Sequence, residues 1–358
     1  MKKGCILLLT IVLLVYGYQA YQVMDIYRND VLKIKTSGKL SDITEKVTPI
    51  PLDIPDSGAV RNMKQVRRDG NNLFILSDSR LLHFDMKGKF INQIAKDLCG
   101  QNGKWIAEYV LDTINHKALV VDNERYLSTF DYNGNLITSS RIDKPWQKIT
   151  ALAFHNGYLW ATAETLVKNN DLPGSYLIEH KLYQLDMNMN EIYSQTLRKA
   201  SSGTRKIFNS LCVDELLVDE QGIYAYSMIS DADLLLEDTL NIALQKKIPL
   251  LYKDAQYGMG CIYPVRKGKR HYLSTCSNCL VDHGFTFCYD DVKQTAYILA
   301  DGFKDDFFKT GHVTDLQSMD IYNDFYCFLK SGNDISKKFP ERADNNDLPV
   351  LFILQLHV

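Results

Sequence analysis

The sequence predicts an all-β protein, a six-bladed β-propeller built from four-stranded antiparallel meanders and closed into a ring by an N-terminal strand. Three observations predict this fold. One hairpin signature recurs along the chain, its copies are spaced by about the length of a propeller blade, and two further short strands precede most copies. Meanders that repeat at roughly 40 to 50 residues are typical of β-propellers.

The hairpin signature is an aspartate between two alternating apolar runs, with a turn residue three positions after it. It reads LHFDMKGKFI around Asp85, TFDYNGNLI around Asp131 and QLDMNMNEI around Asp186, and a weaker copy reads CYDDVKQTAYIL around Asp290. The aspartate can accept hydrogen bonds from backbone amides two residues on, and glycine supplies the positive φ of a tight hairpin. The third copy lacks the glycine, so we expect its asparagine to adopt that conformation.

The spacing of the aspartates indicates the number of blades. Asp85 and Asp131 are 46 residues apart, Asp131 and Asp186 are 55 apart, and Asp186 and Asp290 are 104 apart, or two steps of 52. One degenerate unit therefore lies between the last two copies. The final run LPVLFILQLHV ends one strand short of a sixth unit, and residues 43–52, ITEKVTPIPL, could supply that outermost strand and close the ring. An open sandwich is the alternative, but sandwiches do not repeat a turn at fixed spacing.

These motifs resemble a known family, the six-bladed β-propellers exported by Bacteroides and its relatives, which are distant kin of NHL-repeat propellers. The resemblance rests on TPIPL before the first blade, LHFDMKGKFI within it, a glycine-rich turn before Glu108-Tyr109, and the closing NNDLPVLFIL. It covers the chain after residue 40. The family turn is typically G-x-G-P-x-E-Y, whereas this chain has the longer GQNGKWIAEY without proline. The resemblance implies the fold and export, but no settled biochemical activity.

The N-terminal sequence MKKGCILLLTIVLLVYGYQAYQ predicts export. Lys2 and Lys3 precede an apolar run from Ile6 to Tyr16, which is shorter than the roughly 20 residues of a membrane-spanning helix. Cys5 precedes this run, unlike the lipid-bearing cysteine of a lipoprotein. We expect residues 1–20 to be a signal peptide or a short N-terminal membrane anchor, in which residues 6–17 would contact the membrane. Residues 21–40 are then a linker. Residues 41–358 are expected to form one propeller domain in the periplasm or cell envelope.

Composition narrows the class of partner. The 358-residue chain is 46% hydrophobic and 23% charged with a net charge of -2, so it has no basic field to attract nucleic acid. Membrane contact is expected only through the N-terminal segment. Removal of Cys5 with a signal peptide would leave seven of the eight cysteines, an odd number, which argues against a disulfide framework.

The loops predict which face of the propeller binds. In a blade with strands A to D, the A–B and C–D turns lie on one face, and the B–C and D–A connections lie on the other. The B–C turns are tight in the first two blades (SDSR and DNER), but ETLVKNNDLPGSYLIEH, part of SDADLLLEDTLNIALQKK, STCSNCLVDHG and KSGNDISKKFPERADNNDLP are inserted in blades three to six. Long loops on a rigid scaffold usually carry function. Neutral drift is the alternative, but it does not favour one face.

Five residues on this face are candidate ligand contacts. Trp105 and Trp146 lie in predicted D–A connections, and Lys168, Asp282 and His283 lie in the B–C insertions. We expect the partner to be a small molecule, a glycan or a protein.

The sequence favours a non-catalytic binding protein, with no catalytic residue, metal or cofactor. Cys276 and Cys279 with His283 could bind zinc, form a local disulfide or remain thiols, but a second well-spaced pair is missing. Common hydrolase and nucleotide-binding motifs are absent. The alternative is a metal-dependent hydrolase or lyase at the central channel. Its inner strands would need a ring of His, Asp or Glu, whereas the comparable positions are mixed: Lys64, Glu108, Ala151, Asp214, Cys261 and Ser318.

Overall fold

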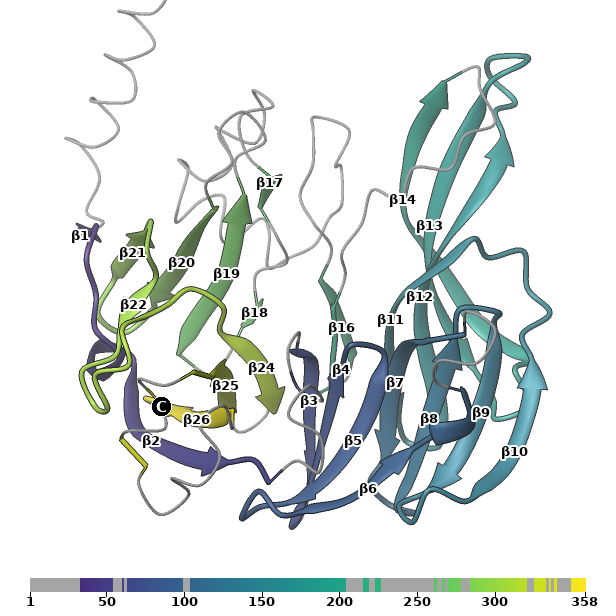
Figure 1. The fold of residues 1–358 in the computed structure, drawn as a ribbon. Helices are drawn as coiled ribbons and strands as arrows, with labels where there is room; N and C mark the ends of the chain where they lie inside the picture. The colour runs from purple at the N-terminus through teal and green to yellow at the C-terminus, as the bar shows by residue number, and fades with distance from the viewer. Residues whose placement is uncertain are drawn as a thin grey trace, which may run out of the picture.

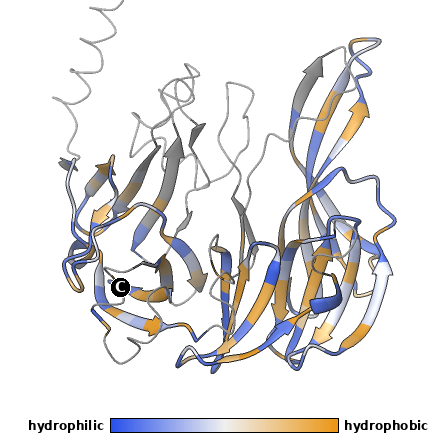
Figure 2. Cartoon of the chain, in the orientation of Figure 1, coloured by the Kyte–Doolittle hydropathy of each residue, from blue (hydrophilic) through white to orange (hydrophobic). Residues whose placement is uncertain are grey.

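The computed structural model confirms an all-β architecture of antiparallel blades (Figure 1). It describes residues 33–53, 60, 63–98, 104–203, 215–218, 223–226, 261–262, 266–267, 270–277, 284–320, 325–332, 335, 338–339 and 349–358. Figure 2 shows hydrophobic residues along the strands of the first three blades. The described residues include no helix that is both long and apolar enough to cross a membrane.

Blades one to three are complete four-stranded meanders, each hydrogen-bonded in sequence order. Blade one contains β3 (Met63–Asp69), β4 (Asn72–Ser77), β5 (Arg80–Asp85) and β6 (Phe90–Ile94). Blade two contains β7 (Ile106–Asp112), β8 (Lys117–Asp122), β9 (Tyr126–Asp131) and β10 (Leu136–Arg141). Blade three contains β11 (Lys148–His155), β12 (Tyr158–Lys168), β13 (Tyr176–Leu185) and β14 (Glu191–Gly203).

The second half of the chain continues the pattern. Blade four is described only as the hairpin β15 (Glu215–Val218) and β16 (Ile223–Tyr226). In blade five, β17 (Cys261–Ile262) and β18 (Arg266–Lys267) both pair with β19 (His271–Ser277), followed by β20 (Gly284–Asp290) and β21 (Thr295–Leu299). A small ribbon of β22 (Phe303–Lys304) and β23 (His312–Val313) leads to blade six, with β24 (Gln317–Asp320), β25 (Phe325–Lys330) and β26 (Val350–Leu356). Two short 3-10 helices are η1 (Leu40–Asp42) and η2 (Lys96–Leu98).

The predicted closing strand is confirmed. Strand β2 (Thr44–Pro51) pairs antiparallel with β26, from Thr44 opposite Leu356 to Pro51 opposite Val350, and completes blade six. Because β26 is the last strand of the chain and β2 is near its start, the two ends of the propeller are joined in one sheet. Figure 1 shows the C-terminus beside β2.

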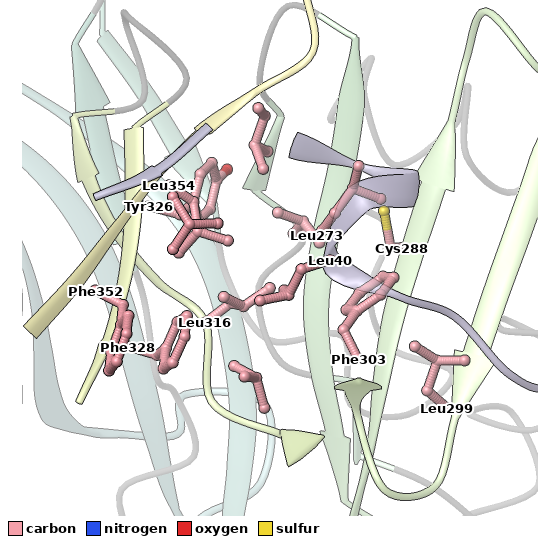
Figure 3. Packing of buried hydrophobic residues seen from close by; sticks show 14 of the residues in the cluster. Leu40, Leu273, Cys288, Leu299, Phe303, Leu316, Tyr326, Phe328, Phe352 and Leu354 are labelled. Atoms are coloured by element: carbon pink, nitrogen blue, oxygen red, sulfur yellow. The ribbon is translucent and has the colours of Figure 1, made fainter. Parts of the chain in front are cut away.

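The segment expected to be a linker is partly built into the fold. Strand β1 (Lys33–Lys35) pairs in parallel with β21 as an additional strand of blade five. Leu40 is fully buried among residues of blades five and six (Figure 3). Ser41 donates from its backbone amide and hydroxyl to the Asp306 carboxylate, at 3.1 and 2.6 Å. The propeller therefore includes residues 33–40, because apolar burial and strand pairing extend upstream of residue 41.

The repeated aspartates form the hairpins that the sequence predicts. The Asp85 carboxylate accepts from the amides of Lys87 and Lys89, both at 2.9 Å, and Gly88 has a φ of +82°. The same arrangement recurs at Asp131 and Asp186. In the third copy the positive φ falls on Met189, at +65°, and not on an asparagine. Asn190 instead donates its side-chain amide to Asp186, which lowers the pKa of that carboxyl group.

A polar cluster joins the turns of blades one and two. The Asp69 carboxylate accepts from the Tyr132 hydroxyl and from His116 Nδ1, both at 2.8 Å. Asp69 is the last residue of β3, beside the A–B turn of blade one, and the other two residues lie in turns of blade two. The Tyr132 ring also packs on Phe74, with centroids 4.6 Å apart. Turns of neighbouring blades are thus held by charge-assisted hydrogen bonds.

Tyr132→Phe is expected to lower the free energy of unfolding by about 2 kcal/mol, because the Asp69 carboxylate, only 12% exposed, loses one of its two side-chain donors. Urea denaturation measures the change. Tyr158→Phe is the matched control, since Tyr158 is 38% exposed at the start of β12, beside another A–B turn. Equal effects of the two substitutions would contradict a stabilising role for this cluster.

Candidate functional site

A hollow of about 330 Å³ opens where blade six meets blade one. Its lining comes from the connection into β24, the end of β25 and the start of β3, and includes Met63, Asp315, Gln317, Phe328, Lys330 and Ser331. Strand A begins and strand B ends at this level of a blade. The hollow therefore lies on the B–C/D–A side of the propeller, the side that the sequence predicts to bind.

One charged side chain of the hollow is half-buried. The Lys330 ammonium donates to the backbone carbonyl of His312 at 2.5 Å. Burial lowers the pKa of Lys330, and the negative charge of Asp305 opposes this effect. The Asp305 carboxylate itself accepts from the amides of Phe307, Phe308 and Thr310 and from the Thr310 hydroxyl. Lys330 is thus a half-buried cation in a small, mostly polar hollow.

Gln317 fixes another part of the lining. Its Nε2 donates to the Met63 carbonyl at 2.9 Å and to the Asp315 carboxylate at 3.0 Å. The first hydrogen bond joins blade six to blade one, and the second orients an exposed carboxylate. Among the described residues, neither Asp315 nor Lys330 forms an ion pair. The hollow therefore presents both signs of charge without an internal salt bridge.

The apolar wall of the hollow is rigidly packed. Phe328 is 2% exposed and stacks on Phe352, with ring centroids 4.8 Å apart and an interplanar angle of 5°. Figure 3 shows these two rings side by side in the cluster between blades five and six. Close packing of this kind leaves side chains little freedom to move, so this wall of the hollow is fixed.

Trp105 lies on the predicted face and is 47% exposed. Its amide donates to Asn123 Oδ1 at 2.9 Å, and the Asn123 amide donates to the Trp105 carbonyl at 3.1 Å. Asn123 belongs to the B–C turn of blade two, so the D–A connection is fixed to that turn. An ion pair between Lys104 and Glu124, at 2.6 Å, reinforces the link. The indole is thus presented from an anchored backbone.

The prediction that Trp146 contributes to a contact surface is wrong. Trp146 is 1% exposed and packs against Tyr183, with ring centroids 4.8 Å apart. Its carbonyl accepts from Arg125 at 2.9 Å. The residue does lie in the connection between blades two and three, but its large apolar ring is buried in the core because burial of an indole is strongly favourable.

The insertion of blade three is mostly strand and not loop, which corrects the sequence interpretation. Strands β12 and β13 pair continuously from Leu159 opposite Leu185 to Lys168 opposite Tyr176, and only residues 169–175 connect them. Strand β14 follows β13 up to Gly203. Together they form a three-stranded ribbon that rises above the disc at the upper right of Figure 1. Lys168 is exposed near its tip.

The remaining candidates fall differently. Asp282, His283 and Cys279 lie outside the described residues. Cys288 is buried as a free thiol, and burial raises its pKa. In the part of the chain that the structure describes, no three His, Cys, Asp or Glu side chains are grouped to hold a metal ion. The signal for Trp105 was its position in a D–A connection, and the signal for Lys168 was the long B–C insertion of blade three.

The inner strands show why the register of the channel could not be read from the sequence alone. A β-bulge interrupts the pairing near the start of β3, β7 and β11. The bulge in β3 falls at Lys64. The residue of β3 at the position equivalent to Glu108 and Ala151, directly after the bulge, is therefore Gln65. Arg67 crosses these strands: its guanidinium lies 5.7 Å from the Tyr109 ring centroid and donates to the Leu152 carbonyl at 3.4 Å.

The hollow originates from segments that the sequence interpretation did not bring together. Residues 313–317 and 328–331 lie close in the sequence, but Met63 at the start of β3 precedes them by more than 200 positions. The hollow lies on the B–C/D–A side, but no pattern in the sequence gave this location.

Comparisons with known proteins agree with the observed architecture. The family described as 6-bladed beta-propeller matches residues 19–216, more than half of the chain. A crystal structure of a candidate exported protein from Bacteroides fragilis is similar with a TM-score of 0.56 and 14% sequence identity, covering 91% of this chain and 100% of that chain. At this identity the likeness shows the fold alone. Among curated proteins, none matches the sequence significantly.

Two more distant structures are also similar to this chain. The β-propeller domain of Cps50 (Swd1) from Myceliophthora thermophila has a TM-score of 0.40 and 8% identity, covering 87% of this chain and 100% of that chain. The WD40 β-propeller domain of Doa1 has a TM-score of 0.41 and 10% identity, covering 87% of this chain and 97% of that chain.

Proposed function

The chain belongs to the 6-bladed β-propeller family, and we propose that it is an exported, non-catalytic protein that binds a ligand or a protein partner through its B–C/D–A face. The hollow between blades six and one carries this proposal, because it is concave and places polar and charged groups beside a packed apolar wall. Small-molecule sites in proteins have these properties. The exposed indole of Trp105 and the raised ribbon of blade three add contact surface on the same side.

The proposed location is the periplasm or cell envelope. Two observations support it: the N-terminal segment has a basic start followed by a short apolar run, and a structurally similar Bacteroides fragilis protein is described as a candidate for export. The partner is a small molecule, a glycan or a protein, and membrane contact is through the N-terminal segment.

Trp105→Ala is expected to weaken binding of a partner at least tenfold without changing the thermal midpoint. Exposed aromatic anchors contribute strongly to interfaces, and this ring is 47% exposed on an anchored backbone. A panel of immobilised glycans and peptides identifies a probe that binds the wild-type protein, and titration gives its affinity for each variant.

Tyr158→Ala is the control for Trp105→Ala, because Tyr158 is an exposed aromatic residue at the start of β12, beside an A–B turn on the opposite face. The proposal predicts that this variant binds as the wild type does. Retained binding in the Trp105 variant together with lost binding in the Tyr158 variant would place the interaction on the wrong face for the proposal.

A further inference from the structure

We propose that the hollow between blades six and one binds a small ligand by its carboxylate, with Lys330 contacting the carboxylate and Asp315 contacting a neighbouring hydrogen-bond donor of the same ligand. The inference rests on the proposed function and names the ligand chemistry of that site. The shared chemistry is a carboxylate beside an ammonium or hydroxyl group, as in an α-amino acid or a uronic acid.

Lys330 carries the first step. Its ammonium has three N–H donors and donates to one carbonyl, that of His312. The nearby Asp305 carboxylate is committed to four hydrogen bonds within its own turn. Burial lowers the pKa of Lys330, so its charge is incompletely solvated. An anionic group that enters the hollow compensates this charge with a charge-assisted hydrogen bond.

Asp315 carries the second step. Its exposed carboxylate accepts one hydrogen bond from Gln317 and forms no ion pair with any described residue. Gln317 is itself held by the Met63 carbonyl, so the carboxylate is oriented from the blade one side. Two opposite charges that line one hollow without pairing favour a ligand that contacts both, and they disfavour a simple anion or cation.

The size of the hollow limits the ligand. A volume of about 330 Å³ is at the lower end of the range for small-molecule sites, roughly 300 to 1,000 Å³. Phe328 and Met63 supply an apolar wall. The site therefore fits one amino acid or one acidic sugar, with its carbon skeleton against that wall.

Isothermal titration of the intact protein at pH 7 tests the proposal with matched pairs of probes. Alanine and leucine are compared with their carboxamides, and glucuronate and galacturonate with glucose and galactose. At least one acid is expected to bind ten times more tightly than its neutral analogue. Lys330→Met should weaken the binding of that acid at least tenfold, while Lys330→Arg should keep its affinity within about threefold of the wild-type value. Lys304→Met, at an exposed lysine outside the lining, should have no effect.

The Asp315→Asn variant distinguishes an amino acid from a uronic acid as the ligand that supplies the carboxylate. This substitution should weaken the binding of an amino acid at least tenfold, because the ligand ammonium loses its counter-charge. It should weaken the binding of a uronic acid by only about threefold. Thermal midpoints equal to wild type show that each variant is folded. The proposal is overturned when no acid binds more tightly than its neutral analogue, or when the folded Lys330→Met variant retains full affinity. Binding of a glycan or peptide that depends on Trp105 would then leave the wider proposal standing.

Discussion

Replacing Gly88 with alanine is expected to destabilise the propeller by about 3 kcal/mol. Gly88 has a φ of +82°, which costs an L-residue about 1 kcal/mol or more. A Cβ atom there would also lie 2.0 Å from the Pro51 carbonyl oxygen and 3.0 Å from Ile50 Cγ2. Both neighbours belong to the closing strand β2, so the substitution pushes that strand outward. Urea denaturation should show the loss.

Two other glycines separate the cost of the backbone conformation from the cost of the steric clash. Gly134 has the equivalent place in blade two, with a φ of +87°, but its nearest obstacle is the Gln93 carbonyl oxygen at 3.3 Å. Gly174 has a φ of +82° and nothing within 4 Å. Alanine at these positions should cost about 1 kcal/mol, mainly for the backbone conformation. Equal losses at all three positions would mean that the C–D turn of blade one does not press on the closing strand.

The second large effect is a loss of stability in acid that depends on His271. This side chain is fully buried at the junction of blade five and the C-terminus, and neither ring nitrogen has a hydrogen-bond partner in the described structure. Burial lowers the pKa of His271 from its ordinary value of 6.5 to about 4, although the Asp290 carboxylate, 3.6 Å away, favours the charged form. Arg270, His357 and Lys293 oppose protonation.

The sign of the change in stability with pH follows from which state of the chain binds the proton. Between pH 6.5 and about 4 the unfolded chain binds a proton at His271 and the folded chain does not. The contribution of neutral His271 is therefore complete above pH 6.5 and is lost as the pH falls, by about 3 kcal/mol in total. Burial raises the pKa of Asp290, but hydrogen bonds from Arg270 and the Lys293 amide hold that pKa at about 2. Its contribution is lost at lower pH, between about 4 and 2.

His271→Phe should flatten the stability profile between pH 7 and pH 4, because the replacement ring does not titrate. The free energy of unfolding is measured by urea denaturation at each pH. His312→Gln is the control, since His312 is exposed on β23 and should leave the profile unchanged. A His271→Phe profile as steep as the wild type would assign the acid sensitivity to other groups.

Local signals were sufficient for the fold. The aspartates at 85, 131, 186 and 290 define hairpins because a carboxylate that accepts backbone amides fixes the turn within a few residues. The closing strand was predictable because a propeller that ends one strand short must take that strand from elsewhere. Its apolar and β-branched residues precede the first blade, and β2 occupies that place.

The failures have a common cause, which is dependence on distant residues. The burial of Trp146 depends on its contact with Tyr183 from another strand. Lys64 is itself the bulge residue of β3, and a bulge is set by the partner strand that it faces and not by a local alternation. The role of β1 required knowledge of the edge of blade five. The hollow required residues 313–317 and 328–331 to meet Met63, which precedes them by more than 200 positions, so no local pattern could locate it.

Hydrogen–deuterium exchange of the intact protein tests the binding face most directly. It is measured with and without the first probe that binds from a panel of glycans, peptides, α-amino acids and uronic acids. Residues 104–106, 313–317 and 328–331 are expected to gain protection, because they form the anchored connection at Trp105 and the lining of the hollow. Protection confined to the A–B and C–D turns, such as residues 113–116 and 291–294, would contradict the proposed face.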